Sequence, residues 1–417
     1  MLKNVYEGKT LLVSGPYNLI LKEGTFEILG TIAEKDERIT VPENKRLAIN
    51  VVKTGKIEMR NDYPAGVKEA NDNPIPLSWE KLVEKILKNK INTVLVIGAA
   101  NTGKSTLITY LSNKLIQHYK SVSAIDSDLG QSDIGPAGTI GLSVIEKKTY
   151  DLSENKVYKQ HFVGSFSPSM SIVEILIGLK KLTASALANS EALIVNTSGL
   201  IDGDTGRLLK ESKIDVLNPD IIVLIQKNNE CEHLVKNLTG RKIFRVSVSN
   251  FVRTKTYEER KLNRKISLGK YLSNAQTVKL SLKKIKLKRC FFTSGTAEPI
   301  PENYANQISY IEKLGLNEGA FIITKKKIEK EKLADLKKKY NSLKIMVSGE
   351  ESGLFAGLMN ESNDYIGIGI LEKIDIVRDN LYIKTCVDAQ LIKSITLGLV
   401  KLDSEGNETG YVEPGTI

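Results

Sequence analysis

The chain has 417 residues, an apolar content of 41% and a formal net charge of +11. This length exceeds what one hydrophobic core usually supports, so two or three domains are expected. No apolar run is long enough for a membrane span, and the scattered Cys231, Cys290 and Cys386 argue against a disulfide framework or a zinc cluster. The start MLKNVYEGKT lacks the apolar core of a signal peptide, which predicts a cytoplasmic protein, and the positive charge is compatible with a polyanionic partner.

Short β-type segments dominate residues 1–75 and predict a small N-terminal β domain. The expected strands cover residues 10–14, 17–22, 26–32 and 47–52. Residues 61–76, NDYPAGVKEANDNPIP, combine Pro, Gly and Asn with little apolar pattern, and we interpret them as a linker.

Apolar strand patterns alternate with helical patterns from residue 76 to residue 273. The expected strands cover residues 94–97, 122–125, 161–163, 193–196, 221–226 and 243–248. Such alternation is typical of βαβ units and predicts an α/β domain with a doubly wound parallel sheet. Short strands return over residues 274–417, with one helical stretch at 328–340, and predict a C-terminal β-rich domain.

The stretch NTVLVIGAANTGKST contains the pattern G-x-x-x-x-G-K-[ST] between an apolar strand and an amphipathic helix. Backbone N–H groups of such a loop cradle phosphates, while the lysine reaches the outer phosphates and the serine binds Mg²⁺. The loop residues expected to bind the nucleotide are Gly98, Ala99, Ala100, Asn101, Thr102, Gly103, Lys104, Ser105 and Thr106. The sequence therefore predicts a site for a nucleoside triphosphate.

Two aspartates follow the next strand in the motif DSDLGQSDIGP. Asp126 and Asp128 stand at the carboxyl end of an apolar run, where α/β sheets bind their ligands. Alternate strand residues face the same side, so both carboxylates are expected to point into the phosphate site. One would hold Mg²⁺ and the other would take a proton from an attacking hydroxyl, and chemistry alone does not say which. The alternative is that both acids merely cap the following turn.

Two later segments complete the candidate site. NTSGLIDGDTGRLL, residues 196–209, follows a strand, and VRTKTYEERKLNRK, residues 252–265, is strongly charged. Arg260 and Arg264 are four residues apart and would share one face of a helix. The alternatives are an ordinary Gly-rich turn for the first segment and a solvated helix face for the second.

These motifs, together with HFVGSFSPS, resemble the archaeal polyribonucleotide 5′-hydroxyl-kinases. Eukaryotic relatives of that family include the kinase subunit of the pre-mRNA cleavage complex and the kinases of pre-ribosomal RNA processing. LKEGTFEILG resembles the N-terminal β domain of the family, and GLFAGLMNESNDYIGIGILEKIDIVRDNLYIKT resembles its C-terminal domain. The resemblance implies ATP- and Mg²⁺-dependent phosphorylation of the 5′-hydroxyl end of RNA, with DNA open as a second substrate.

The resemblance also implies a role for each site residue. Lys104 would contact the transferred phosphate, Asp128 would be the base, and Ser105 and Asp126 would bind the metal. Residues 252–265 would form a lid whose Arg260 and Arg264 neutralise the transferred group. The residues implied to contact the substrate are Gln131, Thr197, Ser198, Gly199, Leu200 and Arg253. In the family an aromatic residue usually follows the glycine of the RNA clasp, so Leu200 is a departure that removes a stacking surface.

Two other functions remain open at this point. The stretch LIQKNNE loosely resembles the guanine-binding motif Asn-Lys-x-Asp of regulatory GTPases, but Gln226 stands at its Asn position and Asn229 at its Asp position. A catalytically silent ATP-binding scaffold in an RNA-processing complex is the other alternative.

Overall fold

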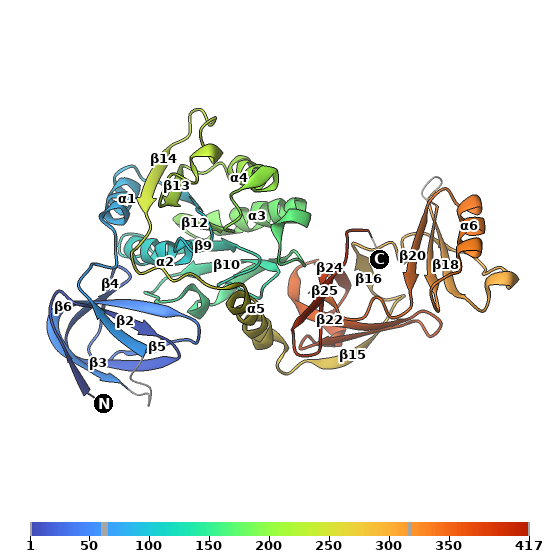
Figure 1. Ribbon diagram of the computed structural model, residues 1–417, viewed down its shortest axis with the longest axis horizontal. Coiled ribbons are helices and arrows are strands. Elements are labelled where there is room, and N and C mark those ends of the chain that lie inside the picture. The colour runs from blue at the N-terminus through green and yellow to red at the C-terminus, as the bar shows by residue number, and fades with distance from the viewer. Residues whose placement is uncertain (1, 60–65, 316–318, 416–417) are drawn as a thin grey trace. The chain divides into compact units, whose positions relative to one another are not determined.

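The computed structural model describes residues 2–59, 66–315 and 319–415 (Figure 1). An antiparallel seven-stranded sheet occupies the N-terminal part, in the order β4-β3-β6-β2-β7, with β1 on β6 and β5 on β3. Its strands are β1 (Leu2–Val5), β2 (Thr10–Ser14), β3 (Tyr17–Ile28), β4 (Thr31–Ala33), β5 (Arg38–Val41), β6 (Arg46–Met59) and β7 (Val67–Ala70). The N-terminal β-rich region is thus confirmed.

The linker predicted at residues 61–76 is wrong in part. Residues 61–65 lie outside the described residues, but β7 pairs antiparallel with β2 at the end of the sheet. All four residues of β7 are at least partly exposed. Because an exposed edge strand needs no apolar alternation, the sequence VKEA carries no strand signal.

A second seven-stranded sheet follows, in the order β11-β10-β9-β12-β8-β13-β14. Its strands are β8 (Thr93–Ile97), β9 (Val122–Ser127), β10 (Thr139–Ile145), β11 (Val157–Phe162), β12 (Ala192–Thr197), β13 (Ile221–Gln226) and β14 (Ile243–Ser247). Strands β9, β12, β8, β13 and β14 run parallel, as predicted. The central strands β8 and β13 are nearly continuous apolar runs because both faces of the sheet are covered. Pairing of β10 with β9 is antiparallel, which the sequence did not indicate.

Helices cover both faces of this sheet (Figure 1). α1 (Leu77–Lys88) contacts α2 (Lys104–Leu115), and α3 (Ile172–Leu187) contacts α4 (Gly203–Leu217). Trp79, the single tryptophan of the sequence, is buried in α1 with its ring 5.6 Å from that of Tyr110 in α2. The Trp79 indole N–H donates to the Ser247 carbonyl at the end of β14, 2.9 Å away. This hydrogen bond ties α1 to the strand that precedes the predicted lid.

The N-terminal sheet and the central sheet share one apolar core. The amide of Asn113 in α2 donates to the Leu29 carbonyl at 2.9 Å and to the Thr149 carbonyl at 2.8 Å. The helix that follows the phosphate loop is therefore fixed against the N-terminal sheet.

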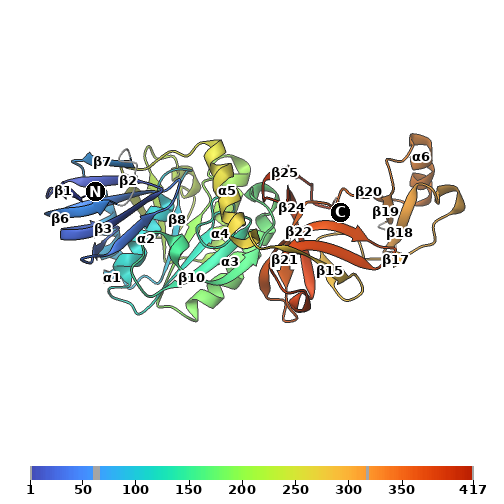
Figure 2. The same cartoon turned by 90° about the horizontal axis from the view of Figure 1, so that it is seen from below.

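The C-terminal part is rich in β structure, as predicted. One sheet has the order β15-β23-β22-β21-β24-β16 with β25 on β24, and a four-stranded sheet has the order β17-β18-β19-β20. The strands are β15 (Gln276–Ser281), β16 (Lys286–Lys288), β17 (Thr296–Ala297), β18 (Ile308–Leu314), β19 (Gly319–Thr324), β20 (Leu343–Val347), β21 (Leu354–Met359), β22 (Tyr365–Asp375), β23 (Asn380–Thr385), β24 (Ser394–Leu402) and β25 (Glu408–Tyr411). α6 (Lys330–Lys339) packs its Leu336 on the smaller sheet (Figure 2).

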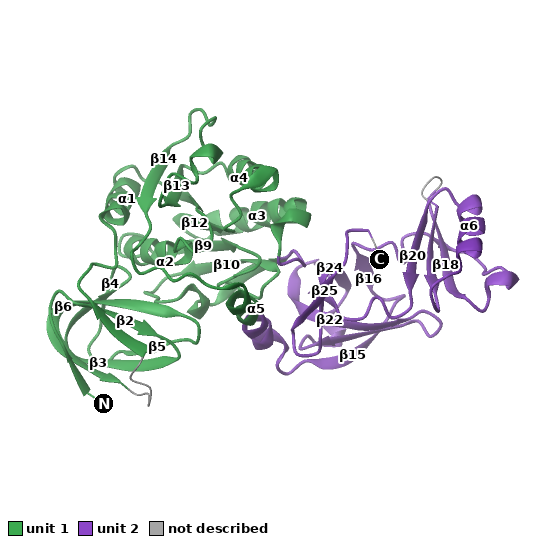
Figure 3. Cartoon of the chain, viewed as in Figure 1, with its two compact units in different colours: residues 1–161, 167–264 green, residues 162–166, 265–417 purple. Residues whose placement is uncertain are grey.

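The chain forms two compact units (Figure 3). One comprises Met1–His161 and Ser167–Arg264, and the other comprises Phe162–Phe166 and Lys265–Ile417. The boundary at residue 264 falls inside α5 (Tyr257–Leu272). The three domains predicted at 1–75, 76–273 and 274–417 stay a prediction. None of the described helices is long and apolar enough to cross a membrane.

Candidate active site

The predicted phosphate loop joins β8 to α2. Asn101 and Gly103 adopt left-handed backbone conformations, with φ of 59° and 85°. Gly98 packs tightly against β13, where an added Cβ would lie 2.6 Å from the Ile225 carbonyl oxygen. Both glycines of the motif thus meet backbone requirements that a larger residue would strain. The loop has the strand-loop-helix setting that a phosphate-binding site needs.

Lys104 begins α2 and folds back over the loop. Its Nζ donates to the carbonyls of Gly98 at 3.0 Å and Ala99 at 2.7 Å, and its side chain is buried. Burial lowers the pKa of Lys104, and the nearby Asp128 carboxylate acts in the opposite direction. An ammonium group therefore lies directly over the loop, where the outer phosphates of a bound nucleotide would be.

Asp126 lies at the end of β9 and is fully buried. Its carboxylate accepts hydrogen bonds from the backbone N–H groups of Asp128 at 3.0 Å and Asp133 at 2.6 Å, and from Nδ2 of Asn196 at 3.0 Å. Burial and the neighbouring carboxylates of Asp133 and Asp128 raise the pKa of Asp126 to about 7. A buried carboxylate of this kind is stabilised in its charged form when a cation binds beside it.

Asp128 follows the last residue of β9, so the alternation argument that placed both carboxylates on one strand face does not apply to it. Its Oδ1 accepts from the N–H groups of Gly130 at 3.2 Å and Gln131 at 3.3 Å, which closes a turn. Asp128 is half-buried, and its charge acts on Lys104. The turn therefore brings the second aspartate beside the phosphate loop.

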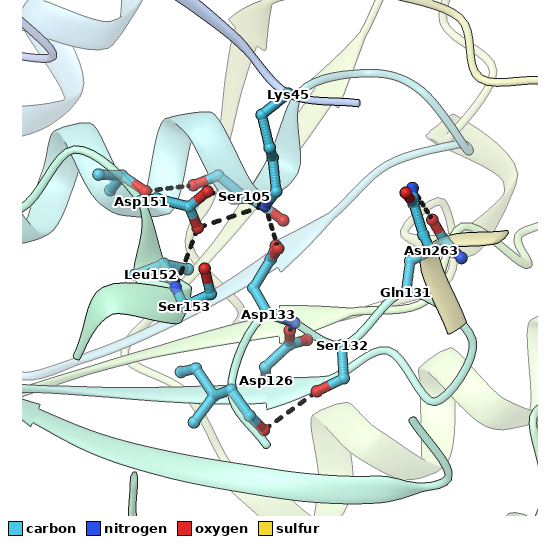
Figure 4. Close-up of polar contacts among 12 residues, drawn as sticks. Lys45, Ser105, Asp126, Gln131, Ser132, Asp133, Asp151, Leu152, Ser153 and Asn263 are labelled. Carbon is cyan, nitrogen blue, oxygen red and sulfur yellow. Dashed lines mark hydrogen bonds and ion pairs between the residues drawn. The ribbon is translucent and has the colours of Figure 1, made fainter. Parts of the chain in front are cut away.

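A third aspartate, Asp133, joins this cluster and was missed by the sequence analysis (Figure 4). Its carboxylate accepts a hydrogen bond from the Ser105 hydroxyl and lies 2.6 Å from Nζ of Lys45, which comes from the turn between β5 and β6. Lys45 also lies 3.0 Å from the Asp151 carboxylate. Burial acts to raise the pKa of Asp133, but Lys45 and Ser105 outweigh it and hold that pKa below its usual value.

We expect Lys45→Met to destabilise the protein by roughly 1–3 kcal/mol, because Asp133 and Asp151 are largely buried and would lose their cation. The matched control is Lys56→Met in the same sheet, whose partner Glu23 is more than half exposed and should contribute little. Thermal unfolding of both variants measures the difference. Equal melting temperatures in the two variants would contradict the expectation.

The predicted clasp follows β12, directly beside the phosphate loop. Thr197 is buried and its hydroxyl donates to the Val96 carbonyl at 2.9 Å, so it joins β12 to β8. Gly199 meets the loop itself, since an added Cβ would lie 2.6 Å from both N and Cα of Ala100. Leu200 is half-buried at the same turn. The two segments that would hold the phosphate donor and the RNA end are therefore in contact.

Gly199→Ala should displace the phosphate loop, because the new methyl group would overlap the backbone of Ala100. We expect ATP affinity to fall by roughly tenfold or more, in line with the 1–3 kcal/mol typical of overpacking. The control is Gly269→Ala, a helix position where an added Cβ has no neighbour within 4 Å. Titration of both variants with ATP measures the affinity. Unchanged ATP affinity in Gly199→Ala would mean that the phosphate loop accommodates the methyl group without losing its binding geometry.

The predicted lid also contacts the phosphate loop. The backbone N–H of Lys255 donates to Oδ1 of Asn101 at 3.3 Å, and an added Cβ on Gly103 would lie 2.9 Å from Val252. Arg253 pairs with Glu259 at the start of α5.

Gln131 connects the aspartate loop to the same helix. Its Nε2 donates to the Arg260 carbonyl at 3.0 Å, and its Oε1 accepts from Asn263 at 3.3 Å. Arg260 and Arg264 are half-buried, and the charge of Arg260 acts on Lys104. The structure therefore gathers the phosphate loop, the aspartate loop and the lid in one place.

The residues present fit a nucleotide with a divalent cation. The loop offers a backbone cradle with Lys104 above it, and Ser105 and Asp126 would supply the hard oxygen donors that Mg²⁺ prefers. A guanine-binding role for Gln226 is disfavoured because both ends of its amide are engaged. Nε2 donates to Glu232 at 2.6 Å and Oε1 accepts from the Cys231 N–H at 3.0 Å.

Known proteins match this chain in sequence and in fold. The family model described as the P-loop of the mRNA cleavage and polyadenylation factor CLP1 matches residues 98–274. Polyribonucleotide 5′-hydroxyl-kinase MJ1315 of Methanocaldococcus jannaschii is 30% identical over 330 residues, covering 78% of this chain and 91% of that protein. Polyribonucleotide 5′-hydroxyl-kinase PH0197 of Pyrococcus horikoshii is 30% identical over 349 residues, covering 82% and 94%.

A solved structure of wild-type Clp1p in complex with Pcf11p has a similar fold. Its TM-score is 0.65 at 13% identity, with 96% of this chain and 97% of that chain covered. The archaeal matches identify the family of the chain, because they combine 30% sequence identity with coverage of most of its length. It belongs to the family of the archaeal polyribonucleotide 5′-hydroxyl-kinases, whose P-loop region it shares with CLP1.

Proposed function

We propose that this protein transfers the γ-phosphoryl group of ATP to the 5′-hydroxyl end of RNA. The observation that carries the proposal is the contact between Gly199 and Ala100, because it sets the predicted clasp for the RNA end against the loop for the phosphate donor. The 5′ oxygen would attack the γ-phosphorus, the bond to the β–γ bridging oxygen would break, and ADP would leave.

Each residue has a role that its position supports. Asp128 takes the proton of the 5′-hydroxyl, since its half-buried carboxylate stands beside the phosphate loop. Lys104 and the loop N–H groups hold the triphosphate, and Arg260 with Arg264 neutralises charge on the transferred group. Thr106 lies in the first turn of α2 beside Ser105. Ser105 and Asp126 would hold Mg²⁺, which would supply positive charge to offset the negative charge of the phosphates.

The predicted substrate contacts belong to the same proposal. Ser198, Gly199 and Leu200 would meet the terminal nucleotide, while Gln131 and Arg253 would act through the adjacent loop and lid. Thr197 has its hydroxyl committed to Val96, so its part in substrate binding would be to fix the end of β12.

An ADP-release assay tests the proposed function. We expect ADP to form from ATP only when RNA with a 5′-hydroxyl end is present, and the same RNA carrying a 5′-phosphate is the matched control. A DNA strand of the same sequence tests the second substrate. Nucleotide hydrolysis that does not depend on RNA, with a preference for GTP, would favour the GTPase alternative. Absence of ADP release despite ATP binding would favour the scaffold.

Arg260→Ala should lower the rate of phosphoryl transfer by about 100-fold with little loss of RNA affinity, because its charge would act on the transferred group in the transition state. The control is Lys270→Ala, which removes an exposed cation from the last turn of the same helix. Single-turnover rates and RNA affinity separate the two effects. An unchanged rate would favour the alternative that residues 252–265 are only a solvated helix face.

A further inference from the structure

Two lysines of α4, Lys210 and Lys213, are fully buried, and no role proposed above uses them. They are three residues apart, so they lie on one face of the helix. In the described part of the chain, the hydrogen bonds of both ammonium groups go to serine oxygens and to no carboxylate. Buried lysines of this kind are rare in proteins unless they are paired.

Each lysine holds one loop of the candidate site. Nζ of Lys210 donates to the Ser198 carbonyl at 2.5 Å and lies 3.4 Å from the Ser198 hydroxyl, in the predicted clasp. Nζ of Lys213 donates to the Ser127 hydroxyl at 2.7 Å and lies 3.4 Å from the Ser127 carbonyl. Ser127 stands between Asp126 and Asp128. One helix face thus reaches both the loop for the RNA end and the loop with the aspartates.

The two loops are neighbours because β9 and β12 are paired in parallel, with Asp126 opposite Asn196 and Ser127 opposite Thr197. The Ser127 hydroxyl donates to the Asn196 carbonyl at 2.5 Å, which joins the ends of the two strands. The ammonium group of Lys213 donates to this same hydroxyl. A displacement of Lys213 would therefore shift the turn that carries Asp128.

Burial of these cations is unfavourable for folding. It lowers the pKa of Lys213 to about 8, against the attraction of Asp128 and Asp126. Burial, with repulsion from Lys213 and Lys104, lowers the pKa of Lys210 well below its ordinary value. If the two side chains only filled space, an apolar residue of similar length would do so without this desolvation. The unfavourable burial of two lysines, each hydrogen-bonded to a loop of the candidate site, therefore favours a role in that site.

We propose that Lys210 and Lys213 are positioning residues for phosphoryl transfer, Lys210 for the clasp that receives the RNA end and Lys213 for the turn that carries Asp128. The inference rests on the proposed function. Replacing the two lysines should therefore have different effects. Loss of Lys210 should weaken binding of the RNA end at the clasp, and loss of Lys213 should slow proton transfer at the Asp128 turn.

The test compares Lys210→Met and Lys213→Met in the full-length protein, with steady-state constants for both substrates and thermal unfolding. Lys210→Met should raise KM for 5′-hydroxyl RNA by about tenfold, the loss of one charge-assisted hydrogen bond, with kcat and KM for ATP within about twofold of the unaltered protein. Lys213→Met should lower kcat by about 100-fold, as expected for a misplaced reacting group, with both KM values within about twofold. Melting temperatures should be unchanged or higher, because methionine fills the space without a buried charge.

The matched control is Lys181→Met, which removes an exposed cation from α3, the helix packed against α4, and should leave kcat and both KM values unchanged. If Lys213→Met does not fold, Ser127→Ala replaces it, with an expected fall in kcat of roughly tenfold at constant KM. The inference would be overturned if kcat and both KM values of the two lysine variants matched those of the unaltered protein. It would also be overturned if kcat and both KM values changed equally and the melting temperature fell. Failure of the unaltered protein to phosphorylate RNA would instead refute the proposed function, and this inference with it.

Discussion

Lys104→Ala is expected to abolish phosphoryl transfer while the fold stays intact. Its ammonium group lies over the phosphate loop, within 3.0 Å of two loop carbonyls, and no other lysine is expected to replace its charge at the outer phosphates. The rate should fall by a factor on the order of 10³ or more, as for the loss of a group that stabilises transition-state charge. The fold should survive, since the loop is shaped by Gly98, Gly103 and their neighbours rather than by the lysine.

The measurement is the single-turnover rate with 5′-hydroxyl RNA, together with thermal unfolding. Lys114→Ala is the matched control, because it removes a lysine from the last turn of the same helix, where it lies over the Tyr110 ring. Near-normal turnover in Lys104→Ala would show that the phosphate site has been placed wrongly.

Asp128→Asn should lower the catalytic rate by about 10³-fold and affect ATP binding far less. An amide cannot take the hydroxyl proton, which general bases of this type accelerate by about 10²–10⁴-fold. Its remaining oxygen can still accept from the N–H groups of Gly130 and Gln131, so the turn should persist. Rate and ATP affinity measured on one preparation separate catalysis from binding.

Asp126→Asn is the companion variant and should behave differently. We expect a defect that added Mg²⁺ partly restores, because Asp126 is assigned to the metal. Because burial and the carboxylates of Asp133 and Asp128 raise the pKa of Asp126, a proton competes with the cation for this carboxylate, and the Mg²⁺ affinity of the unaltered protein should fall as the pH is lowered. Asp126→Asn should lose this pH dependence. Exchanged phenotypes of the two variants would reverse the assignment of base and metal ligand.

Local patterns predicted the parts of the site that are contiguous in sequence. The phosphate loop is recognisable because its glycines, lysine and serine occur within eight residues between a strand and a helix, and the structure has these elements as expected. The alternating strands and helices likewise predicted a parallel sheet, and β8, β9, β12, β13 and β14 form one. Such features depend on neighbours along the chain, which a sequence reveals directly.

The contacts that join distant segments were not predictable in this way. Lys45 and Asp133 are 88 residues apart, and nothing in the loop around Lys45 distinguishes it from other surface lysines. Lys210 and Lys213 are charged residues in a helix, a pattern that ordinarily indicates exposure. The alternation argument treated Asp128 as a strand residue, but β9 ends at Ser127, the last residue that pairs with β12. This end point depends on the neighbouring strand and cannot be read from the local sequence. Tertiary pairing decided each of these positions.

The single tryptophan gives the protein a built-in optical probe. Trp79 lies in the unit that contains the phosphate loop, in contact with Tyr110 of α2 and hydrogen-bonded to the end of the strand before the lid. Emission excited selectively at tryptophan should therefore report on this unit alone, whereas far-ultraviolet circular dichroism reports on the whole chain. Coincident unfolding curves from the two signals would indicate that the units unfold together, and separated curves would give each unit its own transition.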